Sequence, residues 1–170
     1  MIDISIYAKY RDYSYSVSVD LGDCVFPMKL DIGANTTVVS LDAYTRNLNT
    51  DIRTRVLQYC EDCCHNKRMF TSASGDNFWG FPVVAHDVYI ENVLFNDFYY
   101  YLVIENKRVI SLIGVDFLDC CDYTHDRHQG IEISGFDSLY YQNTVKKDSI
   151  DTNDIIAIID EMMVTKAVQS

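Results

Sequence analysis

The chain has 170 residues, of which 48% are hydrophobic, and its formal net charge at pH 7 is −11. This length indicates one domain with room for a substantial core, and the apolar fraction, with 13 Tyr and 8 Phe, excludes a disordered chain and favours strands. The acidic excess repels phosphate backbones, so binding to nucleic acid is not expected.

The ends and the cysteines bear on the cellular compartment. The N-terminal residues alternate between apolar and polar side chains, and no apolar run approaches the roughly 18 residues of a membrane span. The six cysteines are read as reduced thiols, because a chain of this length needs no disulfide scaffold and no export signal is visible. We therefore expect a cytoplasmic protein with no membrane partner.

Two alternating stretches open the chain and predict a pair of strands, over residues 2–8 and 13–19. Asp20 and Gly22 then supply a turn into a third strand, so the second and third strands form a hairpin. Residues 20–22 have an Asp-x-Gly spelling that recurs at residues 31–33, so both segments are candidates for a loop that presents a carboxylate. We interpret residues 20–22 as a turn, because no Thr-rich apolar strand follows them.

The third strand leads to an isolated acid. Residues 26–30 alternate and predict a strand that enters the core and ends at Asp31. Gly33 permits a tight turn before a buried strand resumes at residues 37–39. A carboxylate on a loop between two core strands either caps its own turn or takes part in chemistry.

The next segment loses the strand alternation and predicts a short helix over residues 50–60. Thr50 or Asp51 is the expected cap. The shared apolar face holds Ile52, Val56 and Tyr59 or Cys60. This segment either shapes a substrate groove or covers one side of a barrel, and the sequence leaves both open.

Further strands follow. A hairpin is predicted over residues 69–84, with residues 74–77 near its tip. Phe78 and Trp79 are exposed if the hairpin contacts a ligand, and the alternative is that Trp79 packs in the core and the glycines only turn the chain. Residues 88–102 predict two or three strands, broken at residues 91–92 and 96–97. An apolar strand over residues 109–113 ends at Gly114 and is followed by a short helix, and residues 131–136 predict one last strand.

The composition changes from Asp148 onward. Residues 148–166 predict an amphipathic helix capped by Asp151 or Thr152. Its apolar stripe comprises Ile155, Ile156, Ile159, Met162 and Met163. The stripe must be covered, either by the barrel or by a partner chain. We divide the chain accordingly into residues 1–147 and a C-terminal helix over residues 148–170.

Two groups of metal-ligating side chains suggest a weaker alternative, a zinc-stabilised domain. The first group is Cys60, Cys63, Cys64 and His65, and the second is Cys120, Cys121, His125 and His128. Thiolates and imidazoles at such spacings suit tetrahedral zinc if the two segments meet in space. The competing interpretation is that these cysteines are small core residues, and no metal is then required.

Two motifs resemble a known family. The segment Asp31-Ile32-Gly33-Ala34 followed by Leu112-Ile113-Gly114 resembles the two signatures of the retropepsin-like aspartic proteases. The resemblance covers roughly residues 13–136. It implies a mainly β fold: a closed barrel of six to seven strands with a flap hairpin and a short helix after Gly114. The C-terminal helix would be an addition to that fold.

The resemblance also implies roles for residues. Asp31 would be the catalytic carboxylate, and its loop would comprise Ile32, Gly33, Ala34 and Asn35. The flap and the substrate contacts would come from Ser74, Gly75, Asp76 and Trp79. Gly114 and Asp116 would support the loop, and Asn35 and Asp116 would lie near the substrate backbone. The implied activity is hydrolysis of an extended peptide or protein substrate by a homodimer. Asp31 and its symmetry mate would activate a water, and no cofactor is needed.

One position departs from the family pattern. Residue 32 is Ile, whereas the family normally has Thr or Ser, whose hydroxyl hydrogen-bonds across the dimer. The departure motivates an alternative of another class: a non-catalytic, protease-like module for peptide binding or dimerisation.

Overall fold

The structure is a computed structural model that describes residues 1–63, 66–105, 109–126 and 130–169. Six strands close into a barrel in the order β6-β7-β4-β8-β3-β2, because β2 pairs back onto β6. These strands are β2 (Ser14–Asp20), β3 (Val25–Leu30), β4 (Val38–Ser40), β6 (Asn77–Ile90), β7 (Val93–Val103) and β8 (Leu112–Ile113). Closure removes the unpaired edges that an open sheet would expose.

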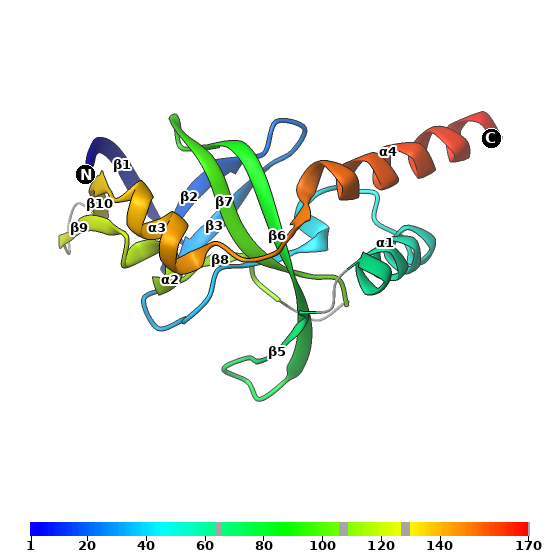
Figure 1. The fold of residues 1–170 in the computed structure, drawn as a ribbon, viewed down its shortest axis with the longest axis horizontal. Helices are drawn as coiled ribbons and strands as arrows, with labels where there is room; N and C mark the ends of the chain where they lie inside the picture. Colours follow the sequence, from blue (N-terminus) through cyan, green and yellow to red (C-terminus); the bar gives the residue numbers. More distant parts are fainter. Residues whose placement is uncertain (64–65, 106–108, 127–129, 170) are drawn as a thin grey trace.

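The remaining strands extend the barrel. Beyond β2 the sheet continues through β1 (Ile2–Arg11) and β10 (Gly130–Phe136) to β9 (Cys121–Asp126). The short strand β5 (Arg68–Thr71) pairs with the start of β6, and β11 (Ile150–Asp151) pairs in parallel with residues 83–84 of β6. Figure 1 shows the hairpin of β5 and β6 projecting from the side of the barrel.

Helices lie at both ends of the long axis. The 3₁₀ helix η1 spans Leu41–Ala43, and the α-helices are α1 (Thr50–Cys63), α2 (Val115–Leu118), α3 (Ser138–Val145) and α4 (Thr152–Gln169). In Figure 1, α1 and α4 lie together at one end, and α2 and α3 lie at the other end beside β1, β9 and β10. None of the described helices combines the length and hydrophobicity that crossing a membrane requires.

The core follows the alternation of the strands. Phe26, Met28 and Leu30 are buried, as their spacing predicts, and the interior of the barrel also takes Phe98 and Leu102 from β7. Helix α4 belongs to the same core: its stripe residues 155, 156 and 159 are buried, and Met162 and Met163 pack against the core with part of their surface exposed. The stripe is therefore covered by this chain.

Buried hydroxyls fasten the start of α4 to the barrel. Tyr100 on β7 shares hydrogen bonds with the hydroxyls of Tyr44 and Thr152, the latter at 2.6 Å between oxygens. Asp151 caps the helix, as predicted, because its Oδ1 accepts a hydrogen bond from the Asn153 N–H at 2.8 Å. These bonds satisfy hydroxyls that would otherwise be costly to bury.

Four sequence predictions about the elements are wrong. Residues 150–151, which were expected within the C-terminal helix, form the strand β11, so residues 131–136 are not the last strand. Residues 96–97 do not break a strand: β7 runs through them, since the Asp97 side chain faces outward and pairs with His86. Helix α1 is capped by Asn49, whose Oδ1 accepts from the Ile52 N–H at 2.9 Å, and not by Thr50 or Asp51. Phe78 is buried, although the sequence suggested exposure beside the hairpin tip.

Candidate active site

The main chain of Asp31 is fixed between two strands. Its N–H donates to the carbonyl of Ile113 at 2.9 Å, and its carbonyl accepts from the N–H of Ala34 at 3.2 Å. The Gly33 N–H donates to Oδ1 of Asp31 at 2.9 Å, so the carboxylate does cap its own turn. Among the described residues, Oδ2 has no hydrogen-bond partner, and the half-buried side chain leaves it open to a ligand.

Gly114 packs closely against the backbone of this loop. A Cβ atom at Gly114 would lie 2.7 Å from the Ala34 carbonyl oxygen and 2.8 Å from the carbonyl carbon and oxygen of Thr36. Such distances are shorter than real Cβ contacts, so only glycine lets the two segments approach this closely. The Val115 N–H then donates to the Ala34 carbonyl at 2.9 Å. The supporting role predicted for Gly114 thus has a direct steric basis.

Thr37 and Asp116 lock the two segments together. The Asp116 carboxylate accepts from the Thr37 N–H at 3.0 Å and from its Oγ1 hydroxyl at 2.6 Å, and Oγ1 accepts from the Gly114 N–H at 3.2 Å. Asp116 also accepts from the Phe117 N–H. Its oxygens are therefore occupied by the protein, which makes Asp116 a positioning residue.

Thr37 positions the Asp31 loop, and sequence reasoning missed this because it interpreted Thr37 only as a strand residue. The available signal was a hydroxyl at the start of the apolar run that follows the loop. The remaining loop positions lie at the surface: the Ile32 side chain is 65% exposed, Asn35 is exposed and Ala34 is half-buried.

The predicted hairpin is present next to this loop. Residues 72–76 form its turn, with the Ser72 N–H donating to the Asp76 carbonyl at 2.8 Å and Gly75 at a φ of +89°. Ser74, Gly75 and Asp76 are exposed at the tip. At the base, the Phe70 and Phe78 rings stack with centroids 5.7 Å apart, and these side chains pack against Val38 of β4.

Trp79 lies on the other face of the hairpin. Neighbouring strand residues point in opposite directions, so Trp79 faces away from the side on which Phe78 packs. Its side chain is 36% exposed, and the ammonium of Lys67 lies 4.8 Å from the centre of its ring. The hairpin side that contacts the barrel is formed by phenylalanines.

The second Asp-x-Gly segment is a turn, as predicted. The Gly22 N–H donates to Oδ1 of Asp20 at 2.7 Å, and Gly22 has a φ of +100°. This turn precedes β3 whereas Asp31 follows it, so about 20 Å of strand separates the two acids. Asp20 cannot be a partner for Asp31 within one chain.

The two cysteine groups do not meet. Cys60 is buried in α1, and Cys120 is buried two residues after the end of α2. Helices α1 and α2 lie at opposite ends of the long axis (Figure 1). Among the described residues, no three His, Cys, Asp or Glu side chains are placed to hold a metal ion. Cys64, His65 and His128 lie outside the described residues. The described parts of the two groups therefore form no joint zinc site, and burial instead raises the pKa of the Cys120 thiol to about 11.

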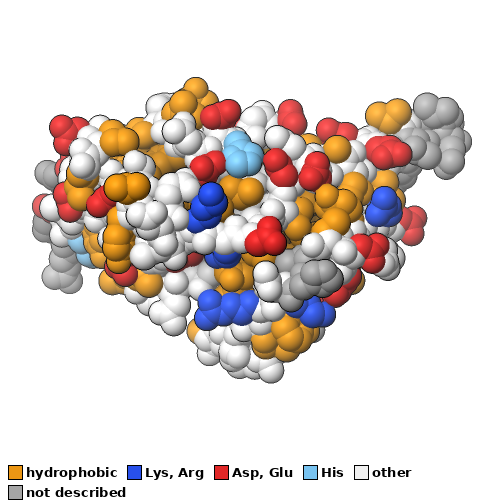
Figure 2. All heavy atoms as spheres, in the orientation of Figure 1, with side chains coloured by type: hydrophobic (Ala, Val, Ile, Leu, Met, Phe, Trp, Pro, Cys, Tyr) orange, Lys and Arg blue, Asp and Glu red, His pale blue; other side chains and the backbone are white. Residues whose placement is uncertain are grey.

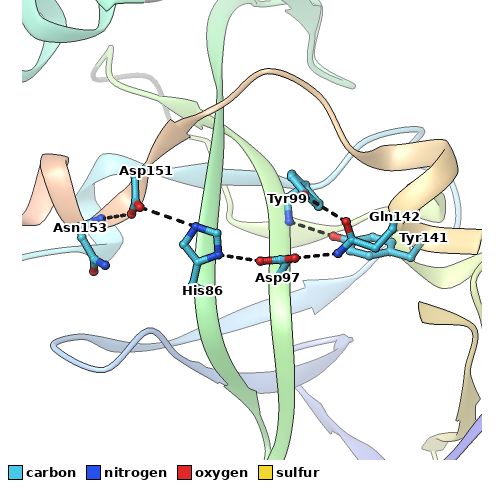
Figure 3. Close-up of polar contacts among 7 residues, drawn as sticks. All are labelled: His86, Asp97, Tyr99, Tyr141, Gln142, Asp151 and Asn153. Carbon is cyan, nitrogen blue, oxygen red and sulfur yellow. Dashed lines mark hydrogen bonds and ion pairs between the residues drawn. The ribbon is translucent and has the colours of Figure 1, made fainter. Parts of the chain in front are cut away.

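A polar network, unforeseen from the sequence, lies on the outer face of the barrel (Figure 3). His86 on β6 contacts Asp97 on β7 through Nδ1 at 2.6 Å, and its Nε2 lies 3.6 Å from Oδ2 of Asp151. Asp97 also accepts from the Gln142 side chain at 2.7 Å. The network joins the barrel to α3 and to the start of α4, and none of its members contacts the Asp31 loop.

Comparisons with known proteins bear on the fold. No protein-family model matches the chain, and no curated protein matches its sequence. Its structure is similar to the crystal structure of a retropepsin-like aspartic protease from Rickettsia conorii, with a TM-score of 0.50 and 16% sequence identity. The match covers 78% of this chain and 98% of that chain. At this identity the likeness establishes the architecture: the chain has a mainly β, retropepsin-like fold with a closed six-stranded barrel.

Proposed function

We propose that this chain is an aspartic endopeptidase of retropepsin type that acts as a homodimer. The observation that carries the proposal is the Asp31 loop. An acid with one free carboxylate oxygen is held at the surface by Gly114, Thr37 and Asp116, beside a projecting hairpin. The retropepsin-like fold supports the same reaction class.

The chemistry requires a second carboxylate. Two acids at hydrogen-bonding distance share one proton, because like charges that close cannot both ionise. The described part of this chain offers one such loop, since Asp20 is separated from it by the length of β3. A twofold axis that passes near Asp31 supplies the second acid from an identical subunit.

The reaction then follows from the shared proton. The ionised carboxylate takes a proton from the bound water as the water oxygen attacks the scissile carbonyl carbon, and the protonated carboxylic acid gives its proton to the carbonyl oxygen. The tetrahedral intermediate breaks at the C–N bond as the amide nitrogen takes a proton from the protonated carboxylic acid and one hydroxyl of the intermediate gives its proton to the other carboxylate, which restores the shared proton. The hairpin, with Ser74, Gly75 and Asp76 at its tip, acts as a flap over an extended substrate.

Ile32 modifies this picture. An isoleucine cannot form the hydrogen bond that Thr or Ser makes across the dimer, and each such bond contributes about 1 kcal/mol. The Ile32 side chain is 65% exposed in the single chain, so burial against its symmetry mate offsets part of that loss. A dimer that forms through this loop would therefore have an apolar contact between the two Ile32 side chains in place of the hydrogen bond.

Replacement of Asp31 by Asn tests the proposal. The substitution keeps the size of the side chain and removes its charge, so we expect cleavage of a denatured protein at pH 4 to 6 to fall by at least about 1000-fold. The Asp20→Asn variant is the matched control and should keep full activity. Undiminished cleavage by the Asp31→Asn variant would rule out the proposed catalyst.

The second candidate is a non-catalytic peptide-binding or dimerisation module, which the exposed Ile32 favours. Under this alternative, the wild-type chain dimerises or binds extended peptides but leaves them intact at every pH. Mass spectrometry of a peptide library incubated with the wild-type chain distinguishes the candidates, because only the endopeptidase produces new termini that disappear in the Asp31→Asn variant.

A further inference from the structure

Two cationic side chains lie over neighbouring aromatic rings at the base of the hairpin. The guanidinium carbon of Arg68 on β5 lies 5.2 Å from the centre of the Phe70 ring. The ammonium of Lys147, in the connection between α3 and β11, lies 4.1 Å from the centre of the Tyr101 ring. We name these four residues the basic rim.

The rim is one continuous group although its members come from distant parts of the sequence. The Phe70 and Tyr101 rings meet edge to face with centroids 5.1 Å apart, so the two cations lie over adjoining rings. Burial lowers the pKa of Lys147, the carboxylate of Asp116 raises that pKa, and the charge of Arg68 lowers it again. Lys147 is therefore within electrostatic reach of both Arg68 and the acid that positions the loop.

The basic rim adjoins the Asp31 loop. Arg68 Nη1 donates a long hydrogen bond of 3.4 Å to Oγ1 of Thr36, and the Tyr101 N–H donates to the Thr37 carbonyl at 3.0 Å. Thr36 and Thr37 form the end of the loop that begins at Asp31. The rim thus lies on the side of the barrel where the proposed cleft runs between the loop and the hairpin.

Neither cation forms a salt bridge within the described part of the chain, although Asp116 lies within electrostatic reach of Lys147. Arg53 and Lys67 form ion pairs with Asp42 and Glu61, whereas no carboxylate lies within salt-bridge distance of Arg68 or Lys147 there. Figure 2 shows Lys and Arg side chains over the hairpin base and the connection above it, on a face that otherwise carries many Asp and Glu side chains. In a protein of net charge −11, two like charges held this close attract an anion.

We propose that the basic rim binds the carboxylate of an aspartate or glutamate side chain in the substrate, so that the enzyme prefers acidic residues near the scissile bond. This inference rests on the proposed function. In a twofold dimer the rim occurs twice, once on each side of the scissile bond. The preference therefore applies to one position on each side, because alternate residues of an extended substrate face the same wall.

Cleavage-site profiling tests the preference. The wild-type enzyme is incubated with a peptide library, and mass spectrometry gives the frequency of Asp and Glu at each position around the cut. We expect acidic residues to be enriched on both sides, and a Glu peptide to have a kcat/KM about tenfold above that of its Gln counterpart. The Arg68→Gln/Lys147→Gln variant should lose the enrichment, whereas the Lys146→Gln variant, which removes a neighbouring exposed lysine, should keep it. Equal profiles for the wild-type and double-variant enzymes would overturn the inference.

A binding measurement separates this inference from the proposed function. The Asp31→Asn chain is titrated with a fluorescein-labelled apolar decapeptide that carries a Glu near each end, and with its Gln counterpart. Fluorescence anisotropy should show about tenfold tighter binding of the Glu peptide, dependent on Arg68 and Lys147 and weakened by salt. Such binding without any cleavage by the wild-type chain would reject the peptidase and retain the acidic preference. Equal affinity for both peptides would reject the preference whether or not cleavage occurs.

Discussion

The local geometry of the Asp31 loop depends on the hydroxyl of Thr37. This hydroxyl donates to Asp116 and accepts from the Gly114 N–H, and it is fully buried. The Thr37 backbone N–H also donates to Asp116, but the Gly114 N–H has the hydroxyl as its acceptor, so the position requires a small side chain with a hydroxyl.

We predict that Thr37→Val destabilises the fold by about 1–3 kcal/mol, because the substitution leaves the buried Gly114 N–H without its acceptor and removes one of the hydrogen bonds to Asp116 Oδ1. Peptidase activity should fall with it, since the loop loses its support. Thr37→Ser retains the hydroxyl and should stay within about 1 kcal/mol of wild type. Urea unfolding measures both free energies, and equal stability of the two variants would show that the hydroxyl is dispensable.

Ile32 is the second position at which we expect a single substitution to have a large effect, here on self-association. We predict that Ile32→Asp raises the dissociation constant of the proposed dimer by about 100-fold, because the proposed twofold axis would bring two like charges together. Leu139→Asp, at a position on α3 that is 70% exposed, is the matched control and should leave dimerisation unchanged. Sedimentation velocity over a concentration series measures both. Equal self-association of the two variants would place any dimer contact elsewhere.

At the scale of elements, the patterns that could be read from the sequence are those with buried side chains at regular spacing. The alternation over residues 26–30, Gly114 after an apolar strand and the spacing of Ile52 and Val56 in α1 each gave a correct element. The position of the loop was predictable from the strands on either side of it, whereas its support by Gly114 was implied by the resemblance to the retropepsin-like proteases. The dependence of the loop on the Thr37 hydroxyl was not predictable from the sequence, because Thr37 and residues 114–116 meet only in the folded chain.

The elements that were missed lack such a pattern. Strand β9 has five exposed residues of six, so it offers no apolar alternation, and it is held by pairing with β10. Helix α3 is short and buries only Tyr141 among its residues. The basic rim was equally invisible, because Arg68 and Lys147 are far apart in sequence and each resembles an ordinary surface cation.

Helix α4 acts as part of the core in this structure. We predict that Ile155→Ala destabilises the protein by about 2–5 kcal/mol, because Ile155 is fully buried and its truncation leaves a cavity. Val164→Ala, at a position on the same helix that is 63% exposed, should change stability by less than about 0.5 kcal/mol. Denaturant unfolding at equal protein concentration compares them. A small effect at both positions would mean that α4 is detached from the barrel in solution.

At the scale of the whole molecule, buried phenols and thiols set an alkaline limit on stability. Burial raises the pKa of Tyr44 and Tyr141 well above the ordinary value of 10.0, and burial raises the pKa of Cys121 to about 12. A raised pKa means that the folded state favours the neutral form. Its contribution is fully present below the pKa of the unfolded chain and is lost as the pH rises through the folded value.

We therefore predict that the urea midpoint of unfolding stays constant from pH 7 to about 8, begins to fall near pH 9 as the thiols of the unfolded chain ionise, and falls steeply above about pH 10 as its phenols follow. The phenolate absorbance of the buried tyrosines should develop together with unfolding, since these phenols ionise only once they are exposed. A constant midpoint up to pH 12 would contradict the role assigned to burial.

The assembly is the property on which the proposed chemistry depends, and mixed dimers measure it most directly. Wild-type and Asp31→Asn chains are unfolded together, refolded in equal amounts at fixed total concentration, and assayed for peptide cleavage. If each active site needs one Asp31 from each subunit, only the wild-type homodimers cut, and activity falls to about one quarter of the pure wild type. A value of about one half would show that each chain works alone and would contradict the account.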